Sequence, residues 1–148
     1  MKALLQRVSS AAVDVAGERV AQIDRGLLVL LGLDRGDDFA TGERLLEKLL
    51  AYRVFPDAHG RMNCSVRDIE GSILLVSQFT LSADTRKGLR PSFTAALAPD
   101  LAEPLYAKLL QSLQQRYPKV GAGVFGADMQ VSLVNDGPVT FLLELTPD

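Results

Sequence analysis

The sequence has one cysteine, one histidine and no tryptophan. Because a disulfide joins two cysteines, Cys64 cannot form one within the chain, and this fits a reducing cytoplasm. One histidine and one cysteine cannot supply a standard zinc site. His59 stands in a turn-forming stretch, where side chains are normally exposed, so no ordinary Ser-His-Asp triad is expected. We therefore expect neither a bound metal nor a cofactor.

Strong charge and long apolar runs are also missing. The formal net charge is -2, so the chain is no general electrostatic nucleic-acid binder and no DNA partner is expected, although a local basic patch could still bind RNA. The longest apolar run, residues 27–33, is far shorter than the ~20 residues that cross a bilayer. The first seven residues do not resemble a signal peptide. We expect a cytoplasmic protein without a membrane partner, folded as a single domain over residues 1–148.

Apolar periodicity predicts a mixture of strands and helices. A glycine at position 17 separates two short alternating segments, which is typical of a hairpin. The run 27–33 has no polar face and therefore predicts a central strand. The full set of expected strands is 3–8, 11–15, 19–23, 27–33, 54–55, 73–81, 128–134 and 141–145.

Two helices are predicted by apolar stripes. The first starts at Asp37 or Asp38, either of which can cap a helix. Its buried stripe is Leu45, Leu46, Leu49 and Leu50. The loop before it, 34–38, is rich in aspartate but matches no calcium-binding pattern. The second helix starts near Pro99, and Tyr117-Pro118 ends it. Its expected stripe is Leu101, Leu105, Leu109 and Leu113, widened by Tyr106 and Leu110.

Polar residues gather at the end of the buried strand 73–81. Ser77, Gln78 and Thr80 follow four consecutive apolar residues. A rigid strand can hold such side chains in a site, but the same residues can also serve only to close a turn. A nearby stretch holds three positive charges, Arg86, Lys87 and Arg90. These could bind phosphates or simply be solvated.

Two glycine motifs need separate interpretation. Residues 121–126 match G-x-G-x-x-G, but a helix precedes them and a strand follows, so a dinucleotide site is not predicted. Residues 135–140 contain Gly137-Pro138 between two expected strands and are typical of a hairpin turn. A Gly–Pro bond is also one that can be cis at about 0.5–1 kcal/mol.

Two segments together resemble a known family. Ser77-Gln78-Phe79-Thr80-Leu81 and Asn135-Asp136-Gly137-Pro138-Val139-Thr140 are similar to the signature pair of D-aminoacyl-tRNA deacylases. The likeness covers nearly the whole chain, including the segments 4–8, 26–29, 87–93 and 125–129, with departures at Leu89 and Ala122, where the family usually has Asn and Thr.

The resemblance implies a fold, an assembly and a reaction. The fold is α/β, with mainly antiparallel strands forming a barrel-like core and two flanking helices. The assembly is a homodimer. The reaction is hydrolysis of the ester between a D-amino acid and the terminal ribose of tRNA, with glycine mischarged onto tRNA as a further substrate.

Residue roles follow from the same resemblance. Gly137 and Pro138 match the Gly-cis-Pro element that enters the partner's pocket, where its carbonyls exclude an L side chain. Arg7 matches the arginine that holds this element. The pocket wall corresponds to Ser77, Gln78, Phe79 and Thr80. The terminal adenosine would lie near Phe125 and Met129. With tRNA as the substrate, the positive charges of Arg86, Lys87 and Arg90 are expected to contact it.

The mechanism is left with alternatives. Thr80 could be a covalent nucleophile, but no base is evident near it in the sequence. The ribose 2′-hydroxyl could instead activate water, with backbone N–H groups near Phe79 and Thr80 as the oxyanion hole. A non-catalytic tRNA-binding module and a hydrolase of small esters are the rival functions.

Overall fold

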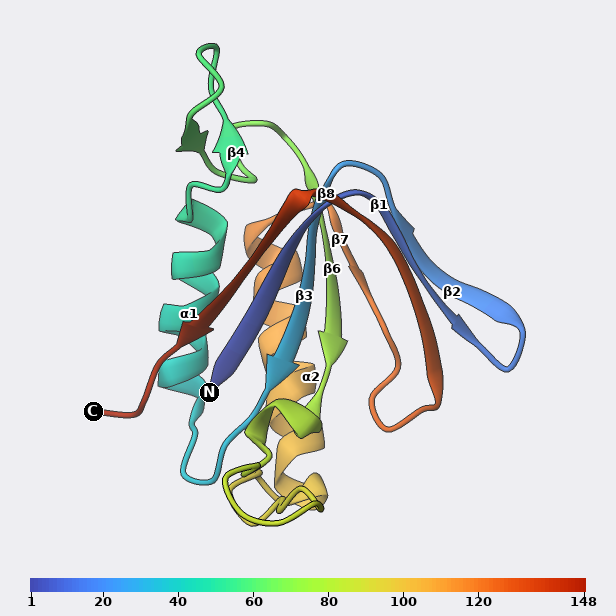
Figure 1. Ribbon diagram of the computed structural model, residues 1–148, viewed down its shortest axis with the longest axis vertical. Helices are drawn as coiled ribbons and strands as arrows, with labels where there is room; N and C mark the ends of the chain where they lie inside the picture. The colour runs from blue at the N-terminus through green and yellow to red at the C-terminus, as the bar shows by residue number, and fades with distance from the viewer.

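One long strand organises the sheet. The computed structural model describes residues 1–148, and in it β1 (Lys2–Val15) pairs antiparallel with three other strands. Its first half lies between β3 (Gly26–Gly32) and the end of β8 (Met129–Glu144), and its second half lies between β2 (Glu18–Ile23) and the start of β8. The parallel strands β6 (Ser72–Ser77) and β7 (Val120–Ala122) continue the sheet beyond β3. The six strands form a mixed, strongly curled sheet (Figure 1).

Two helices complete the α/β fold. α1 (Phe39–Ala51) and α2 (Pro99–Arg116) stand side by side against one face of the sheet (Figure 1). Their apolar side chains share a core with Leu5, Leu27 and Ile73. Leu28 and Leu74, whose side chains point to the opposite face, pack in a second cluster with Val13 of the curled β1. The inner parts of β3 and β6 are therefore buried on both faces, which explains why residues 27–31 and 73–76 are all apolar. The predicted fold class is confirmed.

The predicted hairpin at residues 135–140 is wrong. The two strands expected on either side of it are one strand, β8, because β1 is long enough to pair with both halves. The strands expected at 3–8 and 11–15 are likewise the single strand β1. Gln6 pairs with Thr140 and Val8 with Asn135, so residues 136–139 bulge out opposite Arg7 alone. We call residues 136–139 the Gly-Pro bulge.

The helix predictions are correct in position and partly wrong in detail. Asp38 caps α1, since its Oδ1 accepts from the backbone N–H of Thr41 at 2.8 Å, and all four predicted leucines of α1 are buried. In α2, however, Leu101 is 58% exposed. The buried residues there are Ala102, Tyr106, Leu109 and Leu113. Residues spaced four apart rotate by about 40° per step around the helix axis, because a helical turn holds 3.6 residues. Such a row therefore drifts away from the buried face.

A small appendage lies beyond α1. The strands β4 (Phe55–Pro56) and β5 (Met62–Cys64) form a separate two-stranded sheet. The turn between them carries His59, which is exposed as predicted. Neither helix is long and apolar enough to span a membrane.

Candidate active site

The strand expected at 73–81 ends earlier than predicted. β6 stops at Ser77, and Phe79–Ser82 forms a short 3-10 helix, η1. Its neighbour β3 ends at Gly32, and the last bond between them runs from the N–H of Gln78 to the carbonyl of Leu31 at 2.8 Å. Beyond that bond β6 has no partner. A Cβ on Gly32 would lie 2.9 Å from Cβ of Leu81, so the glycine lets η1 fold back closely over β3.

The first turn of η1 presents free hydrogen-bond donors. Neither the N–H of Phe79 nor that of Thr80 donates to an acceptor in the chain. Both residues are exposed, and Phe79 is 58% exposed. The amide Nε2 of Gln78 donates to Oγ1 of Thr80 at 2.5 Å. Two adjacent unpaired N–H groups on a fixed turn can bind a carbonyl oxygen that gains negative charge.

An apolar cleft opens beside η1. Its volume is about 660 Å³, and fourteen of its twenty lining residues are hydrophobic. The walls come from the end of β6, from η1, from the start of α2 and from the segment 125–131. Phe79 meets Phe93 edge-on with ring centroids 5.1 Å apart, and Phe125 lies 5.7 Å from Tyr106. Such a cleft suits a ligand with an aromatic or apolar part.

The cleft contains few charged groups. Arg35 and Asp128 are its only charged lining residues, and no histidine, lysine or cysteine lines it. Burial raises the pKa of Tyr106 to about 12, so its phenol stays protonated at neutral pH. The Tyr106 hydroxyl donates to the carbonyl of Leu75 at 3.2 Å and is therefore engaged in holding α2 to the sheet. A side-chain base for nucleophilic attack is not evident.

The structure brings together only part of the predicted site. The cleft lining includes five predicted residues: Ser77, Gln78, Phe79, Phe125 and Met129. Thr80 is exposed beside the cleft and is not part of its lining.

The basic loop also lies outside the cleft lining. Arg86, Lys87 and Arg90 are all exposed. The Arg86 guanidinium binds the Asp84 carboxylate at 2.7 Å, and this hydrogen bond lowers the pKa of Asp84. Arg86 is therefore partly neutralised, which leaves Lys87 and Arg90 as the better candidates for phosphate contacts. Leu89, which stands where the family usually has Asn, is fully exposed in the same loop.

Sequence reasoning did not place Arg35 and Tyr106 at the site. Arg35 belongs to a loop considered only for metal binding, and Tyr106 was assigned to a core stripe. Both reach the cleft because the strand order places β3, β6 and α2 together, which no local pattern in the sequence reveals.

The Gly-Pro bulge is held by Arg7 at the other end of the sheet. Nε of Arg7 donates to the carbonyl of Asp136 at 3.0 Å, and Nη1 donates to the carbonyl of Val54 at 2.8 Å. The amide of Asn135 closes the base of the bulge by donating to the carbonyls of Arg7 and Val139, at 3.0 Å each. The Gly137–Pro138 peptide bond is cis, and Gly137 has a φ of +135°.

The bulge and the cleft are far apart within one chain. Arg7 pairs with Leu27, and Leu27 pairs with Ile73, which is four residues before Ser77. At about 3.3 Å per residue this places the bulge ~13 Å from the cleft along the strands alone. In Figure 1 the bend of β8 lies at the top of the molecule, and η1, the short yellow-green helix, lies at the bottom.

Comparison with known proteins shows the family of the chain. The family model described as D-Tyr-tRNA(Tyr) deacylase matches residues 4–144. The chain belongs to this deacylase family. A protein from Stutzerimonas stutzeri (strain A1501) named D-aminoacyl-tRNA deacylase is 61% identical over 144 residues, which cover 97% of this chain and 99% of that protein. A protein of the same name from Cellvibrio japonicus (strain Ueda107) is 54% identical over 145 residues, covering 98% and 99%.

Solved structures of similar proteins share the fold. The c-Myc DNA Unwinding Element Binding Protein has a TM-score of 0.94 and 43% identity, with 99% of this chain and 100% of that chain covered. A probable eukaryotic D-amino acid tRNA deacylase has a TM-score of 0.85 at 17% identity, covering 97% and 98%, which supports the fold alone. The predicted membership of the deacylase family is thus confirmed, and the individual residue roles stay predictions.

Proposed function

We propose that the chain hydrolyses the ester bond of D-aminoacyl-tRNA and releases the free amino acid and tRNA. The observation that carries this proposal is the pair of unpaired N–H groups of Phe79 and Thr80 at the edge of an apolar cleft. Ester hydrolysis passes through an oxyanion, which such donors stabilise. The cleft volume of about 660 Å³ lies within the usual range for small-ligand sites, which suits the aminoacyl end of a tRNA.

Water, activated by the 2′-hydroxyl of the terminal ribose, is the proposed nucleophile. No histidine or lysine lines the cleft, and Thr80 is exposed without a base beside it. A threonine hydroxyl without a base is a weak nucleophile at neutral pH. If water attacks, Thr80→Ala retains measurable hydrolysis and a substrate ending in 2′-deoxyribose is not turned over. The alternative, Thr80 as covalent nucleophile, requires that Thr80→Ala lose all activity while it still folds and binds substrate.

The remaining contacts to tRNA are assigned by chemistry and position. Phe125 and Met129 offer an aromatic face and an apolar side chain for the terminal adenosine, which RNA-binding proteins commonly recognise by stacking. Lys87 and Arg90 are exposed cations on the neighbouring loop and would contact phosphates. Arg86 would contribute less, because Asp84 already binds it.

Selectivity for the D enantiomer is proposed to come from a second subunit. The Gly-Pro bulge cannot reach the cleft of its own chain, since the two lie at opposite ends of the sheet. In a homodimer the bulge of one subunit can enter the cleft of the other and exclude an L side chain by contact. Val134 and Leu142, on β8 on either side of the bulge, are 57% and 48% exposed, as expected of residues covered by a partner. Glycine has no side chain to exclude, so glycyl-tRNA would also be a substrate.

The setting of the enzyme is part of the same proposal. The chain would act as one deacylase domain over residues 1–148 in the cytoplasm, where its tRNA substrates are charged.

One experiment separates this function from its rivals. The protein is incubated with D-Tyr-tRNA, with L-Tyr-tRNA and with free D-tyrosine ethyl ester, and the release of tyrosine is followed. Hydrolysis of D-Tyr-tRNA alone supports the proposal. Binding without hydrolysis would indicate a tRNA-binding module, and equal cleavage of the small ester would indicate a general esterase.

A further inference from the structure

The 3-10 helix η1 is held at both of its ends. At its start, the N–H of Gln78 donates to the carbonyl of Leu31 at 2.8 Å. At its end stands Ser82, which is 3% exposed. The Ser82 hydroxyl donates to Oδ1 of Asp34 at 2.5 Å and lies 3.4 Å from the carbonyl of Leu33. Between these ends, Phe79 and Thr80 are exposed, and their side chains contact Phe93 and Gln78, neither of which lies in a strand.

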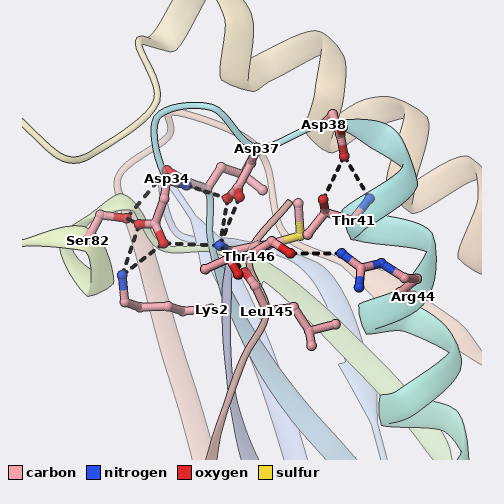
Figure 2. Close-up of polar contacts among 11 residues, drawn as sticks. Lys2, Asp34, Asp37, Asp38, Thr41, Arg44, Ser82, Leu145 and Thr146 are labelled. Atoms are coloured by element: carbon pink, nitrogen blue, oxygen red, sulfur yellow. Dashed lines mark hydrogen bonds and ion pairs between the residues drawn. The ribbon is translucent and has the colours of Figure 1, made fainter. Parts of the chain in front are cut away.

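The Asp34 carboxylate is itself fixed by two cations. Figure 2 shows Lys2 and Ser82 converging on it. The amino group of Met1 also binds it. Lys2 Nζ lies 3.0 Å from Oδ1 and 2.9 Å from Oδ2, and the Met1 ammonium lies 3.0 Å from Oδ2. The backbone N–H of Asp34 also donates to Oδ2 of Asp37 at 2.7 Å. With both oxygens bound, the carboxylate cannot rotate without losing charge-assisted hydrogen bonds.

The ionisation of Asp34 agrees with this geometry. Burial alone would raise the pKa of Asp34, but hydrogen bonds from Ser82, Lys2 and the amino terminus outweigh burial and lower it. The carboxylate is therefore charged at neutral pH and acts as a permanent acceptor for the Ser82 hydroxyl.

We propose that Asp34, acting through Ser82, is a positioning residue for ester hydrolysis, because it fixes the turn that aims the N–H groups of Phe79 and Thr80. The proposal rests on the proposed function of the cleft. It gives a role in the reaction to Asp34 and Ser82, neither of which lines the cleft. Displacement of reacting groups by about 1 Å can cost ~100-fold in rate, so loosening one end of η1 should be visible in kcat.

The test compares three single variants with wild type, using D-Tyr-tRNA as substrate. Ser82→Ala removes the hydroxyl, and Asp34→Asn keeps the shape of the side chain but removes its charge. Asp37→Asn is the matched control, because it removes a charge beside the same Met1 ammonium, which lies 2.8 Å from Asp37, without touching η1. The oxygen of the Asn amide can still accept from the backbone N–H of Asp34, so that contact is kept. Thermal unfolding of each variant shows how much of any loss is general destabilisation.

The expected result is a selective loss of kcat. Ser82→Ala should lower kcat about tenfold or more, with KM within about twofold of wild type, because the cleft that binds substrate is unchanged. Asp34→Asn should lower kcat in the same sense. A fourth protein that combines Ser82→Ala with Asp34→Asn should have a kcat no lower than that of the poorer single variant, since both changes act on the contact between Ser82 and Asp34. Asp37→Asn should keep kcat even where it lowers the unfolding temperature.

Two outcomes overturn the proposal while leaving the proposed function intact. One is a Ser82→Ala protein that folds and has the kcat of wild type. The other is an Asp37→Asn protein whose kcat falls as far as that of Asp34→Asn. The loss of kcat would then reflect general destabilisation and not the positioning of η1. If Ser82→Ala does not fold, the comparison of Asp34→Asn with Asp37→Asn decides alone. A wild-type protein that hydrolyses no D-Tyr-tRNA overturns the proposed function and the positioning role together.

Discussion

The separation of the Gly-Pro bulge from the cleft can be tested by mixing two defective subunits, one with an altered cleft and one with an altered bulge. Phe79→Pro removes one oxyanion donor from the cleft. Proline suits the φ of a 3-10 helix, and Gln78 before it, with φ -146° and ψ 84°, lies outside the helical region that a following proline disfavours. Gly137→Ala deforms the bulge, because a Cβ there would lie 2.7 Å from Cγ2 of Val139 and the φ of +135° strains any other residue.

The expected activities follow from the symmetry of a dimer. Loss of one oxyanion donor costs about 10²–10³ in kcat, so Phe79→Pro alone should be nearly inactive. Gly137→Ala alone should keep an intact cleft but hydrolyse L-Tyr-tRNA as well as D-Tyr-tRNA, because its bulge no longer excludes an L side chain. When equal amounts are refolded together, about half of the dimers are mixed, and each mixed dimer has one intact cleft that faces an intact bulge. About a quarter of all sites should then be both active and selective for the D enantiomer.

The assay is release of tyrosine from D-Tyr-tRNA and, separately, from L-Tyr-tRNA. Different affinity tags at the carboxyl terminus allow mixed dimers to be isolated, which confirms that subunits have exchanged. Isolated mixed dimers should show about half of the wild-type activity on D-Tyr-tRNA and should reject L-Tyr-tRNA. Mixed dimers that hydrolyse L-Tyr-tRNA as Gly137→Ala does would refute the shared site, because the bulge would then act on the cleft of its own chain.

Three further predictions concern stability and binding. Leu49→Ala should lower the free energy of unfolding by about 2–5 kcal/mol, measured by urea denaturation, because Leu49 is fully buried. Lys87→Ala and Arg90→Ala should each weaken tRNA binding and reduce its salt dependence by about one unit of slope, whereas Arg86→Ala should have the smallest effect of the three. The lowered pKa of Asp34 means that its contribution to stability is present above its unfolded-state pKa of about 3.9 and is lost as the pH falls through its folded value. Wild type should therefore lose stability below about pH 4 more steeply than Asp34→Asn, measured by thermal unfolding from pH 7 to pH 2.

The sequence predicted the features that depend on near neighbours. The apolar runs of β3 and β6 indicated strands buried on both faces, and the helix cap at Asp38 was recognised from residue type and position. These features depend on periodicity and on local hydrogen bonds, which a single segment contains. The family was recognised from two short segments, and the comparisons confirm it.

The features that failed depend on which segments meet. Residues 135–140 have the composition of a hairpin turn. Because β1 is long enough to pair with the residues on both sides of them, the chain does not reverse there, and residues 136–139 form a bulge. The end of β6 was predicted too late in the sequence, because β6 ends where its partner strand β3 ends, at Gly32. Asp34 and Ser82 were not connected at all, since they lie 48 positions apart and meet only after β3 and β6 pair.

The pairing of β1 with β8 has a consequence for how the protein is made. β8 is synthesised long after β1, and until it arrives one hydrogen-bonding edge of β1 is left open along its whole length. Open strand edges invite pairing with other chains, and contacts between distant parts of a sequence form slowly. The newly made chain therefore passes through an aggregation-prone stage. This stage ends only when both halves of β8 have paired with β1. Folding yield should fall with rising chain concentration more steeply than in proteins of this size whose strands pair with their neighbours.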